Sequence, residues 1–180
     1  VVDTFADLGY APVLAAPKPI PSGIFKTVRK TAPVQDANGN WVEGYEEVDM
    51  YADDADSTKA EKEAAATLAH AEKLKEQVSS IAKAKRDGGI TVSNLDIATD
   101  TDARSLLTGA QIGGKPTRKM VGTNFRAEVS KVEFDAIVDA VDDHIQAVFD
   151  RQYDLHEAID AVKTDIVALQ AIDLDTGWPV

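Results

Sequence analysis

A glycine-rich stretch of this sequence comes close to a nucleotide-binding motif. The run GAQIGGKPT from Gly109 to Thr117 nearly matches the loop that cradles nucleotide phosphates. That loop needs a strand before its glycines and a magnesium-binding hydroxyl directly after its lysine, where a helix starts. Here a helical pattern precedes the glycines, and Pro116 stands at the hydroxyl position. We therefore predict that Gly113-Gly114 ends a helix and holds no nucleotide.

Two acidic motifs could serve proteolysis or calcium binding. Asp175-Thr176-Gly177 matches the tripeptide of aspartic proteases, whose site also needs a second aspartate sharing one proton. Asp53, Asp54 and Asp56 resemble the start of a calcium loop, but the glycine at its sixth position and the glutamate at its twelfth are missing. We interpret the three aspartates as helix-start residues and Gly177 as part of a turn.

The histidines do not have the spacing of a metal site. His156 and Asp160 are one helical turn apart without further ligands, and His70 and His144 stand alone. Asp142-Asp143 beside His144 has no nucleophile motif to accompany it. The chain contains no Cys, so thiolate catalysis and disulfides are excluded. We expect no enzyme, no metal and no cofactor.

The charge of the chain restricts its partners. The sequence has 31 acidic and 19 basic residues, for a formal net charge of −12. This charge argues against nucleic acid or an anionic membrane as the main partner. No apolar run approaches the roughly 18 residues of a membrane span, and no secretion signal is indicated. The lack of Cys fits assembly in a reducing cytoplasm.

The elements that would position any site are dominated by a long amphipathic helix, predicted from Ser130 to about Leu169. Its apolar residues recur at steps of four and three, and aspartates occupy the opposite face. Ser130 and Glu133 form a capping box, and Val129 with Phe134 a hydrophobic staple. The near-3.5 spacing favours a bundle or coiled coil, with a partner helix from the same chain or from another copy. The predicted interface residues are Phe134, Val138, Val141, Ile145, Val148, Gln152, Leu155 and Ile159.

Gln152 is the one polar residue in this seam. A single polar residue in an apolar seam commonly fixes register and oligomer state. Alternatively, the helix turns away at this point and leaves Gln152 exposed.

An extended arm and a β-hairpin are predicted at residues 1–23 and 24–56. Alternate prolines favour the extended arm, which is either a flexible terminus or a segment lying on a neighbouring subunit. Its apolar residues include Phe5, Leu8 and Tyr10. Asn38-Gly39 predicts a type I′ turn between the strands, and Pro33 an edge or bulged strand. The expected cross-strand contacts involve Val28, Val34, Trp41, Tyr45 and Val48.

A connecting helix is predicted at 57–86, capped by Ser57 or Thr58, and a small β-rich knob at 87–129. Within the knob, Ser93-Asn94 predicts a tight hairpin turn, and Thr99 or Thr101 caps a short helix that ends at Ile112. Further strand candidates are Thr117–Val121 and Asn124–Val129. Residues 130–180 hold the long helix and a tail, in which Trp178 is expected to be a packing anchor.

The order of segments over roughly 87–178 resembles a domain family of unknown function found in tailed-phage tail proteins, among them virion structural and tail-fibre assembly components. The elements that carry this resemblance are Gly89, Val92, Asp100, Asp102, Arg104, Leu107, Gly109, Phe125, the helix around His144, Gln146 and Phe149, and Gly177-Trp178. The resemblance implies a setting in a virion and no particular chemistry.

Together these patterns predict an α+β protein with an extended N-terminal arm, a β-hairpin, a connecting helix, a small β-rich knob and a long C-terminal helix. The expected function is a non-enzymatic structural component of a phage tail, in the fibre or baseplate region. The alternative is a tail-fibre assembly chaperone. The expected partners are other tail proteins and further copies of the chain, without nucleic acid or membrane. The expected location is the virion, after assembly in the host cytoplasm.

Overall fold

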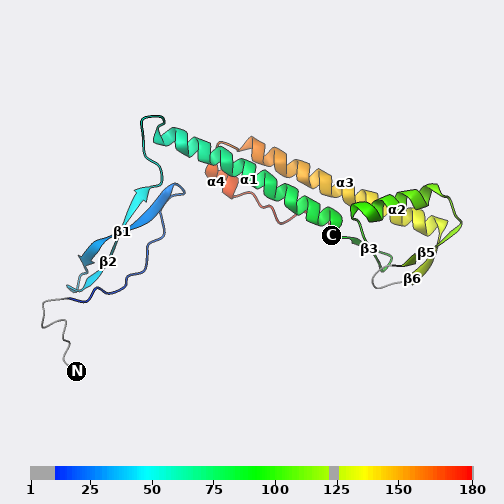
Figure 1. Ribbon diagram of the computed structural model, residues 1–180, viewed down its shortest axis with the longest axis horizontal. Coiled ribbons are helices and arrows are strands. Elements are labelled where there is room, and N and C mark those ends of the chain that lie inside the picture. The colour runs from blue at the N-terminus through cyan, green and yellow to red at the C-terminus, as the bar shows by residue number, and fades with distance from the viewer. Residues whose placement is uncertain (1–10, 122–125, 180) are drawn as a thin grey trace, which may run out of the picture. The chain divides into compact units, whose positions relative to one another are not determined.

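The computed structural model describes residues 11–121 and 126–179 (Figure 1). The chain divides into two compact units, Val1–Ala66 and Thr67–Val180. The elements in chain order are β1 (Lys26–Gln35), β2 (Trp41–Asp49), α1 (Lys59–Asp87), β3 (Ile90–Val92), β4 (Leu95–Ile97), α2 (Thr101–Ile112), β5 (Thr117–Val121), β6 (Arg126–Ser130), α3 (Lys131–Ala161) and α4 (Ile166–Gln170). The predicted α+β class, with small antiparallel hairpins and a long helix, is confirmed. None of the helices in the described ranges is long and apolar enough to cross a membrane.

The first unit is built on the hairpin of β1 and β2. The register of the two strands shifts between Thr31 and Val34, so Pro33 lies in a bulge, as predicted for a residue without an amide donor. Gly44 faces this bulge closely, because a Cβ on it would lie 2.2 Å from the carbonyl oxygen of Ala32. The bulge therefore requires glycine on the opposite strand.

The predicted type I′ turn at Asn38-Gly39 is wrong. A type I′ turn needs positive φ at both central residues, and among the two only Gly39 has it, at 82°. Instead the Asp36 carboxylate accepts hydrogen bonds from the amides of Asn38 and Asn40, both at 2.9 Å, and selects a longer loop. Positive φ at two adjacent residues occurs in the β3–β4 hairpin, at Ser93 (51°) and Asn94 (64°). The tight turn predicted there is confirmed.

The described part of the N-terminal arm lies along β2. The Leu14 amide donates to the carbonyl of Trp41 at 2.8 Å, and the Glu43 amide donates to the carbonyl of Leu14 at 2.9 Å. Ser22 donates through its amide and its hydroxyl to the Glu47 carboxylate. The arm thus contacts the hairpin of its own chain at Leu14 and Ser22. Phe5, Leu8 and Tyr10 lie outside the described residues.

The second unit is organised by α1 and α3, which lie side by side in opposite directions (Figure 1). The predicted starts of both helices are confirmed. Ser130 and Glu133 form the capping box of α3, and Thr58 exchanges the equivalent hydrogen bonds with Glu61 at the start of α1. The staple residues Val129 and Phe134 are buried in one cluster.

The long helix is shorter than predicted. It ends at Ala161, with Val162 as its C-cap, and the chain turns before Asp165 caps the short helix α4. Leu169, which continues the apolar pattern of α3, is instead fully buried against the α1–α3 pair. The pattern continued across the turn because α4 packs on the same core, so periodicity alone could not reveal the break.

The knob consists of β3–β4, α2 and β5–β6 around the first turns of α3. Its apolar contacts join Ile97, Val129 and Met120 to the buried face of α3. Helix α2 is capped by Asp100, whose carboxylate accepts from the amides of Asp102 and Ala103, so the predicted caps Thr99 and Thr101 are wrong. Strand β5 has the predicted bounds. Strand β6 covers the described end of its candidate, while Asn124 and Phe125 lie outside the described residues.

Candidate functional site

The predicted interface residues of α3 lie mostly inside their own chain. Six of the eight are at most 4% exposed: Phe134, Val138, Val141, Val148, Leu155 and Ile159. Ile145 is partly buried against the same face, and Gln152 is half-buried. The sequence left open where the partner helix comes from. In the structure, α1 of the same chain covers Val148, Leu155 and Ile159, and the knob covers Phe134, Val138 and Val141. These side chains therefore have little surface left for another protein.

The seam has two ends with different neighbours. Near the knob, Phe134 and Val138 pack with Val129. Farther along, the C-terminal half of α3 packs on α1 and α4. The residues of this larger cluster are Ala71, Leu74, Val78, Ala82, Val148, Leu155, Ile159, Leu169 and Trp178. This shared apolar core holds α1, α3 and α4 together in the second unit.

Gln152 makes a polar contact across the seam. Its Nε2 donates to the Ser79 hydroxyl of α1 at 3.3 Å. About two turns farther along α3, the Lys75 ammonium donates to Asp160 at 2.9 Å. This contact lowers the pKa of Asp160 and raises the pKa of Lys75. Both contacts are specific to one alignment of the helices. Within the chain, Gln152 thus pairs with one position of α1.

Two side chains close the C-terminal end of α1, and the sequence did not predict either role. The Nε2 atom of His144 lies 3.1 Å from the carbonyl oxygen of Lys85. The hydroxyl of Thr99 donates to the carbonyl of Arg86 at 2.6 Å and accepts from the amide of Gly89 at 2.9 Å. Carbonyls at a helix end lack intrahelical donors, so both contacts satisfy orphan acceptors. A carbonyl only accepts, so Nε2 of His144 carries a proton. His144 is therefore a structural donor.

The phosphate-loop resemblance is explained by a helix stop. Gly113 is the C-cap of α2, and its amide donates to carbonyls of the last turn. Gly114 has a φ of 58°, and strand β5 begins at Thr117. The chain thus passes from helix to strand, which is the reverse of a phosphate-binding loop. The prediction of a glycine helix stop is confirmed.

The Asp-Thr-Gly motif belongs to a closing turn. Asp173 accepts from the amides of Asp175 and Thr176 at 2.9 and 3.2 Å, and Gly177 has a φ of 78°. Trp178 follows, buried in the α1–α3 core, and donates its indole Nε1 to the carbonyl of Leu174 at 2.7 Å. The predictions of a turn at Gly177 and a packing anchor at Trp178 are confirmed.

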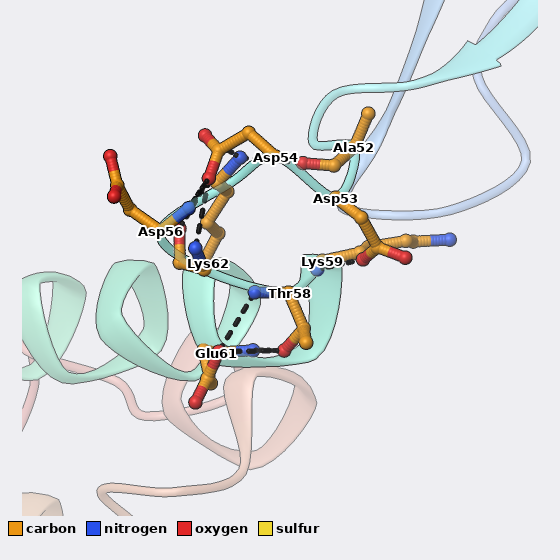
Figure 2. Close-up of polar contacts among 9 residues, drawn as sticks. Ala52, Asp53, Asp54, Asp56, Thr58, Lys59, Glu61 and Lys62 are labelled. Carbon is orange, nitrogen blue, oxygen red and sulfur yellow. Dashed lines mark hydrogen bonds and ion pairs between the residues drawn. The ribbon is translucent and has the colours of Figure 1, made fainter.

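The acidic cluster before α1 is a helix-start network (Figure 2). Asp54 accepts from the amides of Asp56 and Ser57 and from the Lys62 ammonium, and these donors, the ammonium first, lower the pKa of Asp54. Asp53 accepts from the amide of Lys59 at 2.5 Å. Over residues 11–121 and 126–179, no group of three or more metal-ligating side chains could hold an ion.

A groove opens on the knob, between the two small hairpins and α2. It has a volume of about 1030 Å³. We call it the knob groove and define it by six of its lining residues, Ile97, Leu106, Lys115, Lys119, Met120 and Phe134. Sequence reasoning missed it because its lining comes from segments between Gly88 and Phe134 that only the fold brings together.

The exposed side of α3 is strongly acidic and carries two aromatic rings. We call it the α3 acidic face and define it by Asp139, Asp142, Gln146, Phe149, Asp150 and Tyr153, which are all exposed. Apart from the adjacent Phe149 and Asp150, they recur at steps of three and four residues, which places them along one side of the helix. Phe149 is 43% exposed and Tyr153 66%. The Arg86 guanidinium lies 5.8 Å from the centre of the Phe149 ring.

Comparison with known proteins gives one family. The family described as a domain of unknown function, DUF4376, matches residues 69–175, which is more than half of the chain. The match takes in most of the second unit, including both surfaces defined above. No curated protein and no solved structure matches the chain.

Proposed function

We propose that this chain, which belongs to the DUF4376 family, is a non-enzymatic structural component of a tailed-phage tail, in the fibre or baseplate region. The observation that carries the proposal is the order of segments over 87–178, which resembles that of tail proteins. In this role the second unit is a rigid connector, and its virion location follows assembly in the host cytoplasm.

The packing of the second unit supports a mechanical role. The α1–α3 pair has an apolar core, and polar contacts at Gln152 and Asp160 cross between the two helices. A stiff helical pair transmits position from one neighbour to another without changing shape. The partners we propose are other tail proteins and further copies of the chain, joined into a helical bundle or coiled coil.

The burial of the seam changes how such assembly works. Because Val148, Leu155 and Ile159 are covered by α1, contacts with neighbours use surfaces outside this seam. In the first unit, the paired arm and hairpin expose Trp41 at 40% and Val34 at 49%. We propose that this unit docks on a neighbouring virion protein.

Mass spectrometry of purified particles tests the proposal. In particles whose genome encodes this chain, the copy number should stand in a fixed integer ratio to the other tail proteins. A chain that is absent from mature particles, or present in variable trace amounts, would refute the structural role. If it were then found bound to unassembled fibres, it would be the assembly chaperone.

A further inference from the structure

The knob groove carries an excess of unpaired positive charge in a chain whose net charge is −12. Lys115 and Lys119 line it, are exposed, and make no ion pair with any described residue. Arg118 is engaged, because its guanidinium donates to the carbonyl of Ala110 and lies 5.0 Å from the centre of the Phe134 ring. Asp96 and Glu128 also line the groove, and Glu128 lies opposite Lys119 in the β5–β6 register. The three basic side chains Lys115, Arg118 and Lys119 thus exceed the two acidic ones by one charge.

The groove also has apolar surface exposed to solvent. Leu106 on its wall is 75% exposed, and Phe134 and Met120 line the groove from the core side. Charged residues beside exposed apolar side chains are typical of surfaces that bind another protein. The chemistry of this groove therefore suits a ligand that combines carboxylates with apolar or aromatic groups.

The α3 acidic face has that combination. Asp139 and Asp142 make no ion pair within the described ranges, and Asp150 accepts only from Gln146, at 2.7 Å. Phe149 and Tyr153 are one helical turn apart and partly or largely exposed. Negative carboxylates next to two aromatic rings thus match the lysines and the leucine of the groove.

Within one chain these two surfaces cannot meet. Phe134 lines the groove, and Phe149 follows it by 15 residues on the same straight helix. At 1.5 Å per residue, Phe149 lies about 22 Å from Phe134 along the axis of α3, and Asp139, the nearest residue of the acidic face, lies about 7.5 Å from it. A rigid helix does not bring its own middle to its own beginning. The complementary surface must come from a second molecule.

We propose that the knob groove of one copy binds the α3 acidic face of a second copy. The contact joins two different surfaces, so the first copy keeps its acidic face free and the second keeps its groove free. Contacts of this kind repeat into a ring or a filament. The inference rests on the proposed homo-oligomerisation of the tail component and names the surfaces that would form it.

Charge reversal of the full-length chain tests the contact. K115E/K119E makes the groove acidic, and D142K/D150K makes the helix face basic. Each variant alone should dissociate, with the apparent Kd for self-association rising about tenfold or more, as for charged contacts at interfaces. An equimolar mixture should regain assembly, because each copy then offers a surface complementary to the other variant. Sedimentation velocity over a concentration series measures both effects.

A matched control separates the contact from general electrostatics. K18E/K73E makes the same charge change at two exposed lysines outside the groove and the α3 acidic face, neither of which forms an ion pair with a described residue, and should leave the association unchanged. Tyr153→Ala, at a residue 66% exposed, removes one aromatic ring without disturbing the core and should also weaken association.

The outcomes are distinct. Wild-type protein that stays monomeric would overturn the inference, as would association unaffected by K115E/K119E or not restored in the mixture. If particles nevertheless contain the chain at a fixed ratio, the structural role stands and only this contact is wrong. If the chain self-associates through these surfaces but is absent from particles, the inference stands and the proposed function fails.

Discussion

Replacing Ile159 by Ala should destabilise the second unit strongly. Ile159 is fully buried among Leu155, Leu169 and other residues of the α1–α3 core. The change removes three carbon atoms, worth about 2.4 kcal/mol at about 0.8 kcal/mol for each buried group. The remaining cavity adds to this, so we expect a loss of about 3–4 kcal/mol in the free energy of unfolding. With about 3 °C for each kcal/mol, Tm should fall by about 10 °C.

Urea unfolding followed by circular dichroism measures this loss, and its concentration dependence tests the reasoning. All partners of Ile159 lie in the same chain, so the difference between I159A and wild type should not change across a dilution series. Val167→Ala is the control, because Val167 is 65% exposed and its loss should stay within about 0.5 kcal/mol. A cost for I159A below about 1 kcal/mol would show that Ile159 does not lie in a packed core, and a cost that grows with protein concentration would show that another molecule covers the seam.

Two further perturbations test the helix ends. Thr99→Val keeps the shape of a fully buried residue but leaves the Arg86 carbonyl and the Gly89 amide without a partner. The free energy of unfolding, measured by urea titration, should therefore fall by about 2 kcal/mol. An unchanged midpoint would mean that water replaces the hydroxyl. The amide of Ser130, with its hydroxyl, lowers the pKa of Glu133 below its usual 4.5, so this carboxylate stabilises the fold above that pH and loses the effect as pH falls. Tm of E133Q should therefore drop less than that of wild type on acidification, and parallel Tm–pH curves would contradict this.

Local chemistry made several elements predictable from sequence. Ser130 with Glu133, Gly113 after α2, and the Ser93-Asn94 turn each depend on hydrogen bonds or φ angles within a few residues. Pro33 predicted a bulge because it lacks an amide donor. In the β1–β2 loop the contact that sets the loop conformation is also local, because the Asp36 carboxylate accepts from two nearby backbone amides. The predicted type I′ turn was wrong because this contact was not considered. The acceptor at Asp36 was a visible signal, since Asp side chains commonly bond to backbone amides two residues on.

Contacts distant in sequence were not predictable in the same way. Thr99 was expected to cap the helix that follows it, but its hydroxyl serves the end of α1 across 13 residues. His144 reaches Lys85 across 59 residues. The end of α3 at Ala161 had one available signal, the N-cap residue Asp165 before Ile166, but the apolar pattern continued through it to Leu169.

The seam on α3 shows why a pattern that specifies a helix does not specify its partner. The apolar periodicity indicates which side of a helix is buried. Both α1 of the same chain and a helix of another copy could cover that side. The polar positions distinguish the two, because Gln152 meets Ser79 and Asp160 meets Lys75, and both partners lie on α1. Once α1 has taken the apolar face, the surface available to neighbours is the acidic one, where Asp142 and Tyr153 lie. In a chain this acidic, like-charged faces repel each other. A second copy can therefore approach that face only with a basic surface, and Lys115 and Lys119 provide one on the knob.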